Sequence, residues 1–136
     1  MANFVYGKAK QALLNGQINV LSNSLKILIV DSSYVPSANS DQYVSNINPS
    51  YIKNRSAIIQ NIPNTLGVLD ADDITILEHD GAAFKAIVLY ENGTSDSNSR
   101  LIAYIDTSTG LPFAGVNFSL PITIVWSNDL SKILSL

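Results

Sequence analysis

Three aspartates stand close together at Asp70, Asp72 and Asp73, in a pattern that invites metal chemistry. Carboxylate oxygens are the ligands that Ca²⁺ prefers. The glycine and the downstream glutamate of a calcium-binding helix–loop–helix are missing at the required spacing. We therefore favour a turn in which these side chains accept backbone N–H bonds. We predict no bound metal or cofactor, with calcium dependence left as an open alternative.

A second acidic group surrounds the single histidine of the chain, as Glu78, His79 and Asp80. Histidine is the commonest general base and metal ligand, and it titrates near neutral pH. The three residues are consecutive and precede Gly81, so their side chains are not expected to converge on one point. We predict a solvated turn here.

The third candidate is a pair of aspartates, Asp31 and Asp106, each of which closes an apolar run. Two carboxylates can flank a glycosidic bond in a hydrolase. Aspartate at the end of a strand is more commonly a turn former. The chain also has no cysteine, no Gly-x-Ser-x-Gly, no phosphate-binding glycine loop and no His-Glu-x-x-His motif. We predict no catalytic residues, and a protein that is not an enzyme.

The composition points in the same direction. Among 136 residues, 46% are hydrophobic and only 14% charged, with a net charge of −3 and with 17 Ser and 14 Asn. This balance gives no electrostatic reason for a nucleic acid or an anionic membrane as partner. A signal peptide and a membrane-spanning apolar stretch are not recognisable, so we expect a soluble protein that stays where it is made.

The elements that must position these residues are mostly strands. An amphipathic helix is predicted over residues 3–15, capped by Asn3, ended by Gly16 and carrying an apolar stripe that includes Phe4, Ala9, Ala12 and Leu13. Residues 25–31 are apolar and branched, which predicts a central strand buried on both faces. One or two helical turns are expected over residues 40–47, capped by Ser40 and bounded by Pro49.

The remainder alternates between short apolar runs and turn residues, which predicts antiparallel neighbours. The predicted strands cover residues 55–62, 67–69, 73–77, 83–91, 100–105, 117–126 and 132–136. Pro121 cannot donate to a ladder, so its strand should be an edge strand or bulged. We predict a single, mainly β domain over residues 1–136, an antiparallel β-sandwich or barrel with a short N-terminal amphipathic helix. Tyr34, Tyr43 and Tyr51 crowd one irregular region, where they either form a contact surface or roof the core.

Several sequence segments form a distinctive ordered set, of which the most specific is Leu101-Ile102-Ala103-Tyr104-Ile105-Asp106-Thr107-x-Thr109-Gly110-Leu111-Pro112. The other segments are Tyr6-x-Lys8-Ala9-x-x-Ala12-Leu13-x-x-Gly16, Lys26-Ile27-Leu28-Ile29-Val30-Asp31 with Tyr34, Asp70-Ala71-Asp72-Asp73-Ile74-Thr75, Ile87-Val88-Leu89-Tyr90, Ile124-Val125-Trp126, and Lys132-Ile133-Leu134-x-Leu136. In these segments nearly the whole chain, in order, resembles a family of small virion proteins of tailed bacteriophages. The chain departs from the family in a shortened loop after Pro112 and in Phe113 and Phe118.

The resemblance implies a structural protein of the virion, assembled in the host cytoplasm. We expect a capsid decoration or cement protein that forms a homo-oligomer and binds the major capsid protein or other virion proteins. A tail, neck or fibre-associated component is the nearest alternative. A carbohydrate-binding β-sandwich with Tyr34 or Phe113 stacked on sugar rings is an alternative of another class, and a stand-alone β-domain that binds a host protein is a fourth.

Overall fold

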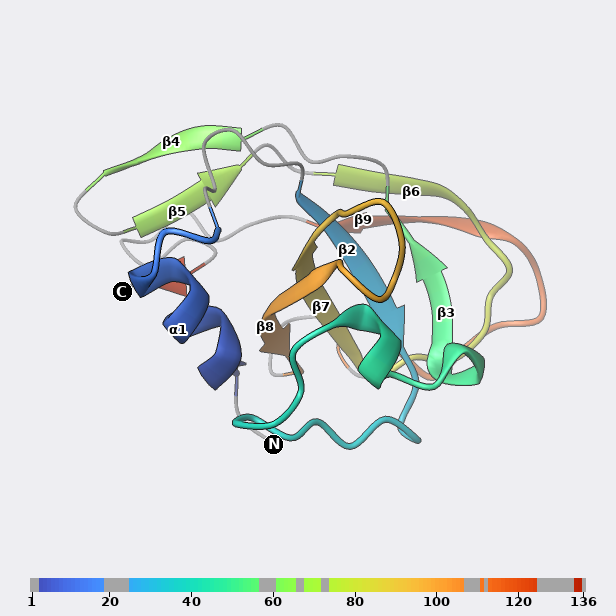
Figure 1. The fold of residues 1–136 in the computed structure, drawn as a ribbon. Coiled ribbons are helices and arrows are strands. Elements are labelled where there is room, and N and C mark those ends of the chain that lie inside the picture. Colours follow the sequence, from blue (N-terminus) through green and yellow to red (C-terminus); the bar gives the residue numbers. More distant parts are fainter. Residues whose placement is uncertain are drawn as a thin grey trace.

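The fold is taken from a computed structural model, which describes residues 3–18, 25–56, 61–65, 68–71, 74–106, 111, 113–124 and 134–135. Its centre is an antiparallel five-stranded sheet in the order β1-β8-β7-β2-β3 (Figure 1). These strands are β1 (Phe4–Val5), β2 (Leu25–Val30), β3 (Ile52–Arg55), β7 (Ala86–Glu91) and β8 (Arg100–Ile105). The mainly β, antiparallel class predicted from the sequence is therefore confirmed.

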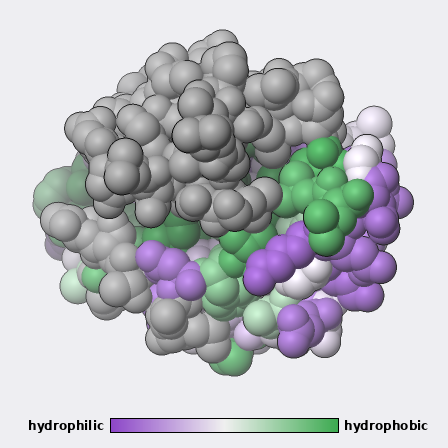
Figure 2. Space-filling model, turned by 90° about the vertical axis from the view of Figure 1, so that its left-hand side faces the viewer, coloured by the Kyte–Doolittle hydropathy of each residue, from purple (hydrophilic) through white to green (hydrophobic). Residues whose placement is uncertain are grey.

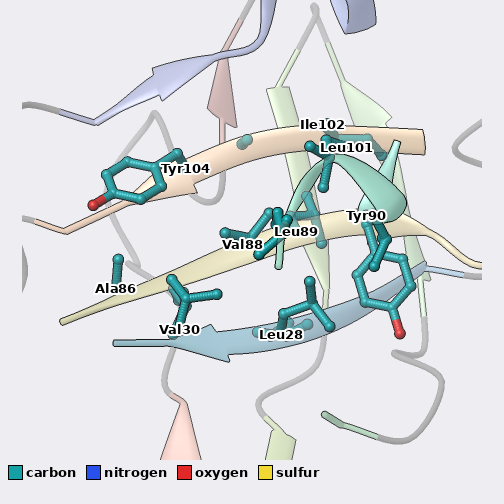
Figure 3. Packing of buried hydrophobic residues seen from close by; sticks show 14 of the residues in the cluster. Leu28, Val30, Ala86, Val88, Leu89, Tyr90, Leu101, Ile102 and Tyr104 are labelled. Carbon is teal, nitrogen blue, oxygen red and sulfur yellow. The ribbon is translucent and has the colours of Figure 1, made fainter. Parts of the chain in front are cut away.

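The middle of this sheet is buried on both faces. All six residues of β7 and five of the six in β2 are buried, as the continuous apolar run in the sequence predicts. Figure 3 shows their side chains packed together, with Tyr104 and Tyr90 toward opposite ends of the labelled cluster. Side chains on both faces of one sheet can be buried only if further elements cover each face.

The covering elements come from three parts of the chain. The core cluster includes Ala9 and Ala12 from α1 (Gly7–Leu14), Val44 and Ile47 from the segment 31–51, and Ile76 from β6 (Ile74–His79). In the view of Figure 1, α1 lies at the left, the segment 31–51 along the bottom, and β4 to β6 along the top.

Two smaller antiparallel sheets complete the described part of the chain. One has the order β10-β5-β4, and the other pairs β6 with β9. The additional strands are β4 (Asn61–Thr65), β5 (Val68–Ala71), β9 (Leu120–Ile124) and β10 (Leu134–Ser135). Within the described residues the edge strands β1 and β3 do not pair with each other, so the main sheet is open. An open sheet favours the sandwich over the barrel.

The predicted helix is real but shorter than residues 3–15. Phe4 and Val5 form a strand that pairs with Tyr104 and Ala103, and the Phe4 ring stacks on Tyr104 at 5.4 Å between centroids. Asn3 is not a cap, because its Oδ1 accepts the backbone N–H of Asp106. The spacing of apolar residues wrongly predicted a helix at Phe4, because pairing with β8 overrides local periodicity in so short a segment. The predicted C-terminus is confirmed by Gly16, whose φ is +71°.

The segment 40–47 contains less helix than predicted. A single 3₁₀ turn, η1, spans Val44–Asn46, and Ser40 does not cap it. The Oδ1 atom of Asn46 instead reaches back to accept the N–H groups of Gln42 and Tyr43. A second 3₁₀ turn, η2 (Pro49–Tyr51), is capped by Asn48, so the boundary predicted at Pro49 is confirmed.

The strand predicted over residues 55–62 is not one strand. β3 ends at Arg55 and β4 begins at Asn61, with residues 57–60 outside the described part of the chain. The prediction for Pro121 is confirmed. β9 pairs with β6 alone among the described strands, and the register shifts between Ile76 and His79, opposite Pro121. A missing N–H is tolerated at such a position.

Candidate functional site

The two aspartates considered as a hydrolytic pair do lie at the same end of the main sheet. β2 and β8 both run antiparallel to β7, so Asp31 and Asp106 leave the sheet on either side of that strand. Two strand spacings separate their backbones, which is about 10 Å. Asp31 accepts the N–H of Ser33 and forms an ion pair with Lys53 at 3.2 Å, while Asp106 is buried. Asp31 thus acts as the turn former that the sequence favours.

Three tyrosines, Tyr6, Tyr34 and Tyr104, are packed together at this end of the sheet. The hydroxyl groups of Tyr6 and Tyr34 lie 2.8 Å apart, and Tyr34 O–H donates to Oδ2 of Asp41 at 2.7 Å. Because a hydroxyl has one proton, Tyr6 must be the donor in its bond to Tyr34. Tyr104 packs edge-on against Tyr34. The chain of hydroxyls ties the segment 31–41 to the residue that precedes α1.

These hydroxyl groups are held in their neutral form. Burial raises the pKa of Tyr6 and, still further, that of Tyr34. Burial and, secondarily, the Asp106 carboxylate raise the pKa of Tyr104 to about 12. At neutral pH all three hydroxyl groups therefore keep their protons, and those of Tyr6 and Tyr34 act as hydrogen-bond donors.

The structure decides between the two interpretations of the tyrosine-rich region. Tyr34 is buried in the core and Tyr51 packs against it. Tyr43 lies under the guanidinium of Arg100, 5.6 Å from the ring centroid to Cζ. Tyr34 and Tyr51 therefore cover the core, as one of the two interpretations holds, while Tyr43 is partly exposed and packs with Arg100.

The solvated turn predicted at Glu78, His79 and Asp80 is wrong for the histidine. His79 is fully buried, with its ring edge-on to Phe84 and Phe113. Nε2 lies 2.8 Å from the carbonyl oxygen of Ala82 and therefore carries a proton, and Asn54 Nδ2 approaches Nδ1 at 3.4 Å. Asp80 is exposed, as expected of a turn residue. Ile76 and His79 are both buried although they are three residues apart, and the pairing register of β6 shifts between them, so simple strand alternation from the sequence could not place this side chain.

An ion pair that we did not predict from the sequence lies at the opposite end of the main sheet. Both terminal nitrogens of Arg55 bind the carboxylate of Asp96 at 2.8 Å, and Ser45 N–H donates to the Asp96 carbonyl. The hydrogen bonds from Arg55 hold the pKa of Asp96 below its usual value, and Asp96 raises the pKa of Arg55. Both side chains are about 40% exposed, so the pair orients the loop 92–99 more than it stabilises the fold.

The calcium question at Asp70, Asp72 and Asp73 falls outside the described side chains. Among the residues whose side chains are described, no three His, Cys, Asp or Glu residues are grouped to hold a metal ion. No helix of the described part is long and apolar enough to cross a membrane.

Several apolar side chains stand at the surface. Leu14 at the end of α1 is 88% exposed, Val35 76% and Phe118 60%. Phe118 lies in the loop that precedes β9. Backbone hydrogen bonds between Phe84 and Phe113 and between Val116 and Gly81 fix this part of the chain. On the face that carries α1, hydrophobic and hydrophilic residues adjoin one another (Figure 2). Leu14, Val35 and Phe118 are the most exposed large apolar side chains among the described residues.

Comparison with known proteins did not extend this picture. No protein-family model matches the chain, and searches of the curated proteins and of the solved structures gave no match.

Proposed function

We propose that this chain is a structural protein of tailed-bacteriophage virions that decorates the head and braces contacts between subunits of the major capsid protein. The observation that carries the proposal is the ordered resemblance over nearly the whole chain, with residues 101–112 as its most specific piece. We further propose a homo-oligomer that acts without a cofactor or catalytic group, and without nucleic acid or membrane as partner.

The position of the matching residues supports a shared fold. Residues 26–31, 87–90 and 101–105 are the three central strands β2, β7 and β8, and nearly all of them are buried. Because the matching residues lie mostly in the core, the resemblance concerns residues that stabilise the fold. It leaves the attachment surface to be identified from the exposed residues.

The surface chemistry suits attachment at many equivalent places. A charge of −3 on 136 residues limits repulsion between crowded copies. Single exposed apolar residues, such as Leu14 and Phe118, bury little area each. Repetition over a symmetric lattice raises the total binding strength when copies are linked in an oligomer.

The N-terminal helix is not a free docking element. Ala9 and Ala12 are buried against the chain's own core, and Tyr6 just before the helix is fully buried. Deletion of residues 1–16 would therefore disturb the fold as well as any contact. Substitution of Leu14 by serine instead tests the exposed end of the helix without changing a buried side chain.

The copy number in purified virions is the decisive measurement. Quantitative mass spectrometry against the major capsid protein should give a ratio near one, or a simple fraction set by a local symmetry axis. A few copies per particle would instead move the protein to the tail, neck or a fibre. Absence from the particles would overturn the virion proposal.

Attachment can then be mapped with single variants that keep the fold. We expect Leu14→Ser, Val35→Ser or Phe118→Ser to lower the occupancy of stripped capsids in a competition with the wild-type chain. The matched control is Ser97→Ala, which alters an exposed polar residue of the loop 92–99. Unchanged occupancy for all three variants would exclude attachment through the exposed apolar residues.

The carbohydrate-binding alternative is not favoured by the geometry. Tyr34 is buried, and its hydroxyl is engaged with Tyr6 and Asp41. The ring of Phe113 is stacked on Phe84 at 4.9 Å between centroids. Sugar stacking needs an exposed ring face, which the buried Tyr34 does not supply, and one face of the Phe113 ring is already covered by Phe84.

A further inference from the structure

The chain contains two Asn-Gly dipeptides, Asn15-Gly16 and Asn92-Gly93, and the structure places them in very different surroundings. Asparagine followed by glycine is the sequence most prone to spontaneous deamidation, because glycine has no side chain to hinder ring closure. We propose that Asn15 is a site of spontaneous succinimide and isoaspartate formation in the folded protein, whereas Asn92 is protected. This inference is independent of the proposed function.

The chemistry needs only water and a base. The Gly16 backbone nitrogen loses its proton and attacks the side-chain carbonyl carbon of Asn15. A new C–N bond forms, the bond to the side-chain amide nitrogen breaks, and ammonia leaves. Water then opens the five-membered imide at one of its two carbonyl groups, which yields aspartate or isoaspartate and adds one negative charge.

Asn92 is held in a geometry that prevents this attack. The Gly93 N–H donates to Oγ of Ser99 at 2.9 Å, and Ser99 is 2% exposed and donates in turn to the carbonyl of Ser95. A Cβ atom built on Gly93 would come within 2.8 Å of the Asn98 carbonyl oxygen. The attacking nitrogen is therefore engaged and closely surrounded.

Asn15 has the opposite environment. It is the exposed C-cap residue that follows α1, and the Gly16 N–H makes a long bond of 3.2 Å to the Leu13 carbonyl. Among the described residues, no atom outside Asn15, Gly16 and Gln17 lies within 4 Å of the Cβ position of Gly16. A helix of eight residues frays readily at its end, which frees this N–H and lets the Asn15 backbone rotate.

Conversion would change the end of the helix. The new carboxylate would stand at the negative end of the helix dipole, next to the exposed Leu14. Isoaspartate would also lengthen the backbone by one methylene between Asn15 and Gly16. The Gly16 and Gln17 N–H bonds to the last helical turn, which follow the inserted methylene, would then lose their geometry.

The test is deamidation of the folded chain at mildly alkaline pH, followed by tryptic peptide mapping. Fragment spectra assign the mass gain to Asn15 in peptide 11–26 or to Asn92 in peptide 86–100, and a protein isoaspartate methyltransferase labels the product. We expect Asn15 to convert at least about tenfold faster than Asn92 in the folded chain. In urea-unfolded chain the two rates should converge.

Two variants complete the design. Asn15→Gln should abolish the fast phase, and Ser99→Ala should accelerate conversion at Asn92 while the rate at Asn15 stays unchanged. Circular dichroism and the urea midpoint of Ser99→Ala are measured alongside, because an unfolded variant would also accelerate conversion at Asn92. Equal rates at the two asparagines of the folded chain, or a Ser99→Ala variant without acceleration at Asn92, would overturn the proposal.

Discussion

Replacement of Tyr34 by phenylalanine removes one buried hydroxyl that takes part in two hydrogen bonds. Tyr34 accepts from Tyr6 at 2.8 Å and donates to Asp41 at 2.7 Å. The variant keeps the ring and its packing against Tyr104, so the loss is confined to these bonds. We expect the free energy of unfolding to fall by about 2 kcal/mol.

The magnitude follows from what each partner loses. Tyr6 is fully buried, and its O–H would be left without an acceptor, which costs about 1–3 kcal/mol. Asp41 is only half-buried and keeps the Ser37 N–H, so water replaces the lost donor at small cost. For a domain of this size the expected change in Tm is roughly 8 °C.

The assay is urea unfolding monitored by circular dichroism, in which the midpoint should shift while the m-value stays constant. Tyr51→Phe is the matched control, because the Tyr51 hydroxyl makes no hydrogen bond to another described residue and its ring also packs against the core. This control should change stability by less than about 0.5 kcal/mol.

The comparison with Tyr6→Phe tests the direction of the bond. That variant leaves an unused lone pair on Tyr34 while Tyr34 still donates to Asp41, so it should cost only about 1 kcal/mol. The double variant should cost less than the sum, because both changes remove the same bond. A Tyr34→Phe variant as stable as Tyr51→Phe, or less costly than Tyr6→Phe, would refute the reasoning.

Three further predictions concern stability. Burial raises the pKa of Tyr34 above that of an unfolded tyrosine, so the stabilisation that its neutral hydroxyl provides is complete below about pH 10 and is lost as the pH rises further. The unfolding free energy, measured against pH, should therefore fall above about pH 10. The fall should be less steep in Tyr34→Phe. Leu28→Ala should cost about 2–5 kcal/mol in chemical unfolding, because this side chain is fully buried, whereas Leu14→Ala should stay within about 0.5 kcal/mol. Gly81→Ala should lower Tm more than Gly16→Ala; both glycines have positive φ, but only at Gly81 would a Cβ meet backbone oxygens, at 2.5 and 2.6 Å.

Local signals in the sequence located most of the strands. The run from Leu25 to Val30 is apolar and branched, and it became the buried centre of the sheet. The strand predicted at residues 100–105 has the same bounds in the structure, and Pro121 lies at an edge, as its missing N–H requires. These predictions succeeded because alternation, branching and turn chemistry act within a few residues.

The polar residues were harder to assign. His79 was expected in a solvated turn because it stands just before Gly81, yet its ring packs edge-on against the stacked pair of Phe84 and Phe113. Arg55 and Asp96 are 41 residues apart in sequence, and nothing near either residue indicates the other. The Tyr6–Tyr34 bond likewise joins segments that meet only when β1 is placed beside β8.

The sequence by itself determined that this protein is mainly β, where its central strands lie, and that Gly16 ends its helix. Tertiary structure alone decided that Phe4 joins a strand, that the main sheet stays open, and that Asp31 and Asp106 leave it at the same end. The physical reason is the range of the interactions. Strand propensity and turn formation are local, whereas pairing order and burial depend on contacts between residues far apart in the chain.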